Sequence, residues 1–291
     1  MINKAVILCG GLATRFLPFS KSVPKEMLPI LNKPILQLLI EDLHKAGITQ
    51  VLIVTSRNKE AITKFFDRNV ELENRLIETN KEYLLDSTYY AYKLVDVYIK
   101  QQGEVKGTGY GVKLAKNWVG NEPFIMTYGD EILFNNNKNV FEQLIDAYNR
   151  NKKTVIAVQK CPKDEVYKYG IIDYDKKIGK DYTVKRIIEK PKVEDAPNDI
   201  SYIGPSVITS EIFDEIDKLK VKPNEEIVLT NAFDLLAQKN RVVACEIDGE
   251  RHDLGNKLGF LKANIYAGLK DKDIKDDLKY YLMNLLFKNK Y

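Results

Sequence analysis

The first half of the chain alternates between short apolar runs and segments whose apolar residues recur at helical spacing. Residues 5–8, 50–55, 123–128 and 154–159 form continuous apolar runs of strand length. Residues 34–45 instead place their apolar side chains three or four positions apart, which predicts a helix. Continuous apolar strands separated by helices indicate a mostly parallel sheet that helices cover on both faces.

The second half of the chain has a different pattern. Residues 169–174, 183–189 and 202–209 are short strand-like runs separated by turn residues, which predicts a smaller and more antiparallel β region. Residues 258–266 and 276–287 have helical spacing and predict C-terminal helices. We therefore expect an α/β fold with a Rossmann-like, mostly parallel mixed sheet, to which this β region and the terminal helices are added.

Composition narrows the class of protein. The 291 residues include 45 basic and 41 acidic side chains, a net charge of +4, which argues against the concentrated basic face of a nucleic-acid binder. No run approaches the roughly 18 apolar residues of a membrane span. The chain opens on a strand without a signal-peptide pattern, and its three cysteines are far apart. These features predict free thiols in a reducing compartment, the cytoplasm.

The first strand runs into a loop that carries the main chemical signal. Gly10 and Gly11 follow the strand, and Arg15 and Lys25 come soon after them. Glycines let backbone N–H groups approach phosphate oxygens where a Cβ would collide, and the basic side chains add positive charge. The loop has neither P-loop nor dinucleotide-binding spacing. It predicts a nucleoside triphosphate site, although two glycines alone are more typical of a simple turn with solvated basic side chains.

Two aspartates are candidate metal ligands. Asp130 follows the strand at 123–128, and Asp253 follows the last strand, at 242–247. Mg²⁺ usually takes one or two protein carboxylates together with phosphate oxygens, although either aspartate alone could be a cap or turn residue. Glu131 is the weaker candidate, because successive side chains of an extended segment point in opposite directions. Ligands bind at the carboxyl ends of parallel strands, so we expect these segments to converge on one crevice.

Further candidates lie in a second glycine-containing loop and beyond it. Gln102 precedes Gly107, and its amide can donate and accept together, which suits the imide edge of uracil or thymine. The alternative is a plain helix-entry loop. Glu189 could accept hydrogen bonds from sugar hydroxyls while Lys190 binds a phosphate, or the two could form an ordinary surface ion pair. Gly170 could present its backbone amide to a ligand, or could simply begin a strand.

Taken together, these motifs resemble those of the sugar-1-phosphate nucleotidylyltransferases. The segments 5–15 and 24–29 resemble the family signature, and 102–109, 189–192 and 252–259 are similar to its later motifs. Within the family, the chain most resembles the bacterial members that transfer uridylyl groups from UTP to glucose 1-phosphate. The resemblance runs from about residue 4 to residue 268. Ala13 and Pro205 depart from the pattern, which usually has a glycine and an arginine at these places.

The resemblance implies roles for individual residues. Arg15, Lys25, Asp130 and Lys190 would act in the reaction, and Asp130 and Asp253 would hold Mg²⁺. The nucleotide would contact Gly10, Gly11, Gln102 and Gly107, and the sugar phosphate would contact Gly170, Glu189, Lys190 and Gly204.

The resemblance also implies a reaction and an assembly. Glucose 1-phosphate would attack the α-phosphorus of UTP in line, releasing pyrophosphate, in a homodimer or homotetramer. One nucleotidyltransferase domain would comprise a nucleotide-binding portion at 1–160, a sugar-phosphate-binding portion at 161–255 and C-terminal helices at 256–291. Two alternatives stay open, a thymidylyltransferase acting on glucose 1-phosphate and a non-catalytic nucleotide-sugar sensor.

Overall fold

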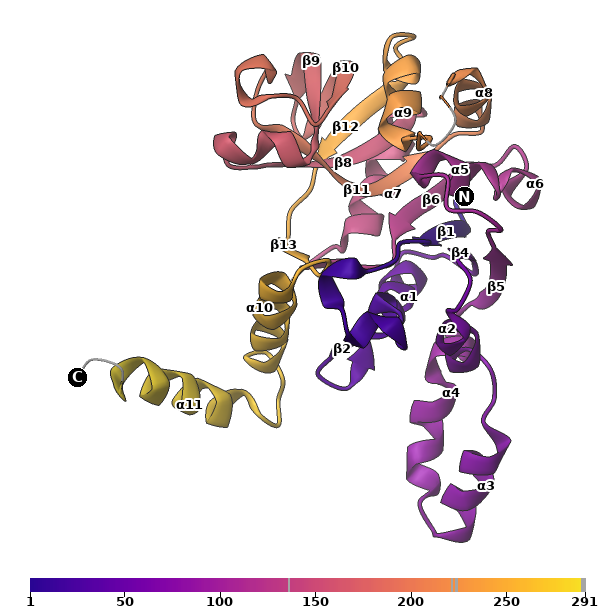
Figure 1. The fold of residues 1–291 in the computed structure, drawn as a ribbon, viewed down its shortest axis with the longest axis vertical. Helices are drawn as coiled ribbons and strands as arrows, with labels where there is room; N and C mark the ends of the chain where they lie inside the picture. The colour runs from indigo at the N-terminus through magenta and orange to yellow at the C-terminus, as the bar shows by residue number, and fades with distance from the viewer. Residues whose placement is uncertain (136, 221, 223–224, 289–291) are drawn as a thin grey trace.

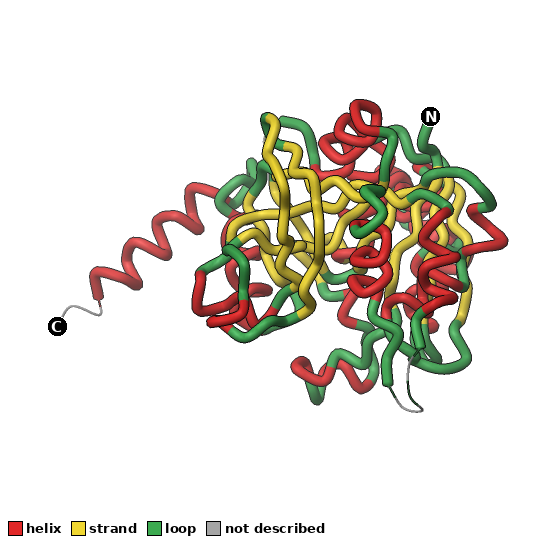
Figure 2. Tube along the Cα trace, turned by 90° about the horizontal axis from the view of Figure 1, so that it is seen from above, coloured by secondary structure: helices red, strands yellow, loops and turns green. Residues whose placement is uncertain are grey.

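A nine-stranded mixed sheet forms the centre of the molecule (Figures 1 and 2). The computed structural model describes residues 1–135, 137–220, 222 and 225–288. The sheet order is β5-β4-β1-β6-β11-β8-β12-β10-β9. The strands are β1 Lys4–Cys9, β4 Gln50–Thr55, β5 Asp96–Gln101, β6 Phe124–Tyr128, β8 Thr154–Lys160, β9 Gly170–Ile178, β10 Asp181–Glu189, β11 Ile200–Ile208 and β12 Val242–Glu246.

Strand directions divide this sheet into two parts. Strands β5, β4, β1 and β6 run parallel, and the apolar runs of β4, β1 and β6 predicted this. Strand β11 is antiparallel to both β6 and β8, and β10 is antiparallel to β12 and β9. The expected mixed α/β fold, with a more antiparallel second half, is therefore confirmed. The antiparallel strands do not form a separate sheet. Strand β11 lies between β6 and β8, which both precede it in the chain, and so joins the two parts into one sheet.

Two apolar layers cover the faces of the sheet. Strand β1 alternates between them, with Ile7 in one layer and Val6 and Leu8 in the other. The first layer buries the apolar sides of α1 Ile35–Lys45 and α7 Val140–Asn151. The second buries those of α5 Thr108–Lys113, α8 Glu211–Lys218 and α9 Leu229–Ala237. Coverage of both faces leaves the strand ends as the natural place for a ligand.

Local sequence sets where these helices begin. Asn139 precedes α7, where its side chain accepts from the backbone N–H groups of Phe141 and Glu142, and the Glu142 carboxylate accepts from the N–H of Asn139. This capping box satisfies N–H groups that lack partners within the helix. Pro34 precedes α1, and its fixed φ suits the entry to a helix.

Two small ribbons and several shorter helices complete the fold. The ribbons pair β2 Pro29–Ile30 with β3 Lys33–Pro34, and β7 Glu131–Phe134 with β13 Glu250–Asp253. The remaining helices are α2 Glu60–Phe65, α3 Val70–Glu78, α4 Leu85–Leu94, α6 Lys116–Val119, α10 Lys257–Gly268 and α11 Lys275–Lys288.

Two helical segments extend away from the sheet (Figure 1). Helices α3 and α4 form one projection, and α11 forms an arm at the other side of the molecule. Exposed apolar side chains line this arm: Tyr280, Tyr281, Met283, Leu285, Leu286 and Phe287. Within the described part of the chain, no helix has the length and apolarity needed to cross a bilayer.

Candidate active site

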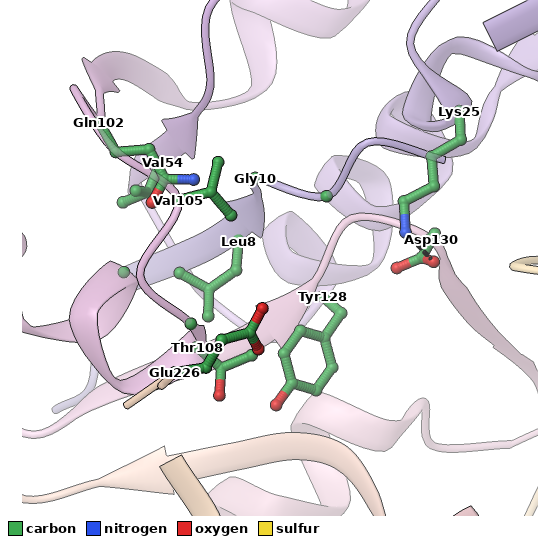
Figure 3. A pocket seen from close by; sticks show the side chains of 13 residues that line it. Leu8, Gly10, Lys25, Val54, Gln102, Val105, Thr108, Tyr128, Asp130 and Glu226 are labelled. Carbon is green, nitrogen blue, oxygen red and sulfur yellow. Dashed lines mark hydrogen bonds and ion pairs between the residues drawn. The ribbon is translucent and has the colours of Figure 1, made fainter. Parts of the chain in front are cut away.

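A pocket opens where the parallel strands β1, β4 and β6 end (Figure 3). The loops after these strands and after β5 bring distant parts of the sequence together there, as the sequence predicted. Its lining residues are Leu8, Gly10, Gly11, Lys25, Val54, Gln102, Val105, Gly107, Thr108, Gly111, Tyr128, Asp130 and Glu226.

The first glycine loop is built to accommodate a glutamine side chain. A Cβ added at Gly10 would lie 2.1 Å from Nε2 of Gln102, so the Gln102 amide occupies the space that a larger residue would fill. Gln102 is buried, and its backbone N–H donates to the carbonyl of Thr55 at 2.8 Å. Ala13 adopts a left-handed conformation with φ of 52°. This conformation favours glycine, and the loop adopts it here with an alanine.

The second loop is held from behind by a segment much later in the chain. Gly107 has φ of 93°, and a Cβ there would lie 2.6 Å from the carbonyl oxygen of Ile227. The N–H of Gly109 donates to that same carbonyl at 2.7 Å. Glu226 reaches the pocket from this segment and was given no role by the sequence analysis. Residues 226–230 also resemble a motif of the family, and this resemblance is the sequence signal that could have found Glu226.

Lys25 and Asp130 form an ion pair at one end of the pocket (Figure 3). Both side chains are largely buried, at 18% and 20% exposure. Burial alone would lower the pKa of Lys25, but the charge and hydrogen bond of Asp130 raise it above its ordinary value. Lys25 is therefore a permanently charged group at neutral pH, placed beside the glycine loop.

The carboxylates of Asp130 and Asp253 approach the same point. Residue 253 lies opposite Glu131 in the β7–β13 ribbon. A Cβ added at Gly255 would lie 2.9 Å from Oδ1 of Asp253, 3.3 Å from Oδ2 of Asp130 and 3.7 Å from Nη1 of Arg15. In the structure Oδ2 of Asp130 is paired with Lys25, and Oδ1 of Asp253 accepts from the N–H of Gly255 at 2.8 Å. Carboxylate oxygens are the ligands that Mg²⁺ uses, and Arg15 adds a group for an anion.

The Glu131 side chain points away from the place where the Asp130 and Asp253 carboxylates meet. This is expected for the residue that directly follows Asp130 in an extended segment. Glu131 is buried and forms an ion pair with Arg251, whose guanidinium lies 5.1 Å from the centre of the Tyr169 ring. Burial raises the pKa of Glu131 to about 7, and the charge of Arg251 opposes that rise. The ion pair thus joins the two strands of the ribbon, in which Asp130 precedes β7 and Asp253 ends β13.

The four residues expected on the sugar side lie on the antiparallel strands β9, β10 and β11 or directly after them. The carboxylate of Glu189 accepts from Oγ1 of Thr230 at 2.7 Å, and a Cβ at Gly170 would lie 3.3 Å from that carboxylate. Gly204 has φ of 109°, and a Cβ there would lie 2.6 Å from Oε2 of Glu131. The Lys190 side chain is 63% exposed, with Nζ 3.7 Å from Glu189. None of these four belongs to the lining of the pocket formed by described residues.

The chain is similar to known proteins over nearly its whole length. The model of the nucleotidyl transferase family matches residues 4–267. A UTP–glucose-1-phosphate uridylyltransferase of Staphylococcus epidermidis is 40% identical over 284 residues, 98% of each chain. One from Staphylococcus haemolyticus is 41% identical over 286 residues, 98% of this chain and 99% of its own.

Solved structures show the same fold. UTP-bound UGPase from Acinetobacter baumannii superposes with a TM-score of 0.90 at 32% identity, covering 98% of this chain and all of its own. A UDP-glucose pyrophosphorylase complexed with UDP-glucose gives 0.84 at 31% identity, covering 93% of this chain and 100% of its own. With a family model over most of its length and relatives at 40% identity, this chain belongs to the nucleotidyl transferase family.

Proposed function

We propose that this protein transfers the uridylyl group of UTP to glucose 1-phosphate, giving UDP-glucose and pyrophosphate. The named activity of its relatives supports the proposal. The main structural observation is that a glycine loop, an amide and an ion pair line one pocket. The residues are Gly10, Gln102, Lys25 and Asp130. These are the groups that a pyrimidine nucleotide and its phosphates need.

Binding of the two substrates is divided between the two parts of the sheet. The amide of Gln102 would pair with the imide edge of uracil, and the backbones of Gly10, Gly11 and Gly107 would approach the nucleotide. Arg15 would bind the triphosphate. On the antiparallel side, glucose 1-phosphate would contact Gly170, Glu189, Lys190 and Gly204. For Lys190, the exposed ammonium must turn toward the phosphate when the substrate binds.

The cofactor we propose is Mg²⁺, held by Asp130 and Asp253. When bound, it would reduce the repulsion between the two reacting phosphates. Lys25 is at present paired with Asp130, so its ammonium is already within reach of the site. In the complex, Lys25 would turn from the carboxylate to the α-phosphate and offset the charge that develops there. The attacking phosphate is already an anion, so alignment and charge neutralisation suffice without a general base.

We also propose the arrangement of the whole chain. Residues 1–160 would bind the nucleotide, 161–255 the sugar phosphate, and 256–291 would form the C-terminal helices of one domain. We propose a cytoplasmic homodimer or homotetramer, and the apolar side chains exposed on α11 support self-association. Sedimentation of the protein and of a Leu286→Glu variant would test this, since a monomeric parent would contradict it.

The test of the activity is pyrophosphate release over a grid of nucleotides and sugar phosphates, with and without Mg²⁺. We expect UTP with glucose 1-phosphate to turn over fastest, and only with the metal. Faster turnover of dTTP would favour the thymidylyltransferase, because the two bases differ by one methyl group. We expect Asp130→Ala to lose nearly all turnover while it stays folded. Turnover at the parental rate by that variant would contradict the proposed metal site.

A further inference from the structure

A buried ion pair contacts segments that adjoin the pocket, and it has no part in the chemistry described so far. Nζ of Lys59 lies 2.8 Å and 3.0 Å from the two carboxylate oxygens of Glu26. Glu26 is 0% exposed and Lys59 is 8% exposed. The same ammonium donates to the carbonyl of Cys9 at 2.7 Å. One buried cation thus joins three segments of the chain.

Each of these segments leads directly to a residue of the proposed site. Cys9 ends β1 and immediately precedes Gly10. Glu26 follows Lys25 within the short 3₁₀ helix Lys25–Met27. Lys59 comes from the loop after β4, whose last residues border the pocket. The ion pair is therefore one residue away from the glycine loop on one side and from the lysine on the other.

The pair also contacts the segment that carries the metal-binding candidate. A Cβ added at Gly129 would lie 2.5 Å from Sγ of Cys9 and 2.8 Å from Cγ of Glu26. The N–H of Gly129 donates to the carbonyl of Leu8 at 3.0 Å. Gly129 thus rests against Glu26 and Cys9, and Asp130 follows it. Any movement of the Glu26 side chain would be passed to Gly129 and so to Asp130.

The energetics favour a geometric function for this pair over a stabilising one. Burial raises the pKa of Glu26, and the charge of Lys59 opposes that rise. A buried ion pair often contributes no more stability than well-packed apolar residues of the same volume, because both charges are removed from water. An apolar pair, however, could not hold the Cys9 carbonyl. The ammonium fixes that carbonyl and both carboxylate oxygens with directional bonds.

We propose that Lys59 and Glu26 are positioning residues for nucleotidyl transfer, which rests on the function proposed above. Their pair holds the end of β1 and the Lys25–Met27 turn in register with Gly129. It thereby sets the distance between the glycine loop, Lys25 and Asp130. The residues expected to bind the sugar phosphate are on other strands, β9, β10 and β11, or directly follow them. The pair should therefore act on the nucleotide and on turnover, and leave sugar-phosphate binding alone.

The experiment compares Lys59→Met, Glu26→Gln and the double variant with the parent. A misplaced reacting group costs about 100-fold in rate, so we expect each single variant to lose about that factor in kcat/KM for UTP. We expect KM for glucose 1-phosphate to stay at the parental value. The double variant should melt above either single variant, because no buried charge is left unpaired, yet remain impaired with UTP.

A matched control separates positioning from general loss of stability. Glu215 on α8 is also a buried carboxylate, 4% exposed, and it accepts from the ammonium groups of Lys218 and Lys239. It lies outside the pocket, so Glu215→Gln should lower the melting temperature without changing KM for UTP. Parental UTP kinetics in folded Lys59→Met and in the double variant would overturn the proposal.

Backbone hydrogen exchange gives a readout that does not depend on activity. We expect peptides covering residues 9–15 and 25–28 to exchange faster in the double variant than in the parent, and at the parental rate in Glu215→Gln. If the parent itself releases no pyrophosphate from UTP, the proposed function fails, and exchange still decides whether the pair holds these segments. Unchanged exchange in both segments would overturn the positioning role.

Discussion

Replacing Gly10 by alanine is expected to disturb base recognition and leave the fold intact. The new Cβ would lie 2.1 Å from Nε2 of Gln102, which no pair of unbonded atoms tolerates. The atom that it meets is at the far end of a flexible side chain, so rotation of Gln102 relieves the overlap. The backbone of the loop does not have to move, and the melting temperature should change little. The Gln102 amide, however, leaves the place where it can pair with uracil.

The size of this effect follows from the burial of Gln102. The Gln102 side chain is only 5% exposed, so water cannot replace the hydrogen bonds between its amide and the uracil base that the variant loses. Leaving a buried polar group unpaired costs about 1–3 kcal/mol. That range corresponds to a decrease of roughly 5- to 150-fold in kcat/KM for UTP. KM for glucose 1-phosphate should be unchanged, because its proposed binding residues are on other strands.

The assay is steady-state kinetics on Gly10→Ala, Gln102→Ala and the double variant. If the alanine acts only by displacing Gln102, the double variant should be no worse than Gln102→Ala alone. Gly103→Ala is the matched control, because a Cβ at Gly103 would have nothing within 4 Å. Additive losses in the double variant, or an equal loss in Gly103→Ala, would refute the reasoning.

Three further predictions concern stability. Gly204→Ala should cost about 1–2 kcal/mol of backbone strain and a further 1–3 kcal/mol or so of overlap with Glu131 and Tyr128. Gly179→Ala, also at positive φ but in open space, should cost only the strain, so equal urea midpoints would contradict this account. Because Glu131 keeps its proton to about pH 7 when folded, against 4.5 unfolded, stability should fall as pH rises through that window. Glu131→Gln should reduce this dependence of the free energy of unfolding on pH. An unchanged dependence in the variant would exclude Glu131 as its source. Asn139→Ala should lower the free energy of unfolding by about 1 kcal/mol, measured by urea titration, and a loss below a few tenths would contradict the cap's role.

The parallel part of the fold could be predicted because its signals are local. Continuous apolar runs mark β1, β4 and β6, and the glycines at 10 and 11 mark the end of the first strand. The rule that ligands bind at the carboxyl ends of parallel strands then brings Asp130 beside the glycine loop. These inferences need only spacing and one general rule, and the structure confirms the convergence that they predict.

Long-range pairing could not be predicted in the same way. Nothing near Lys59 in the sequence indicates that its ammonium meets Glu26, and a lysine before a helix is ordinarily exposed. The ribbon of β7 and β13 joins residues 120 positions apart, such as Glu131 and Arg251, and its strands have only four residues each. Such short strands lack a periodic sequence signal, so tertiary contacts determine whether they form.

The central place of β11 has a consequence for synthesis of the chain. Strand β6 and strand β8 are made early, but the strand that separates them comes only with residues 200–208. Until then, one edge of β6 and both edges of β8 have unpaired N–H and C=O groups and can join the wrong neighbour. We therefore expect the nascent protein to be most prone to aggregation while its first 200 residues are outside the ribosome. Slow codons just before β11 should lower the yield of folded protein.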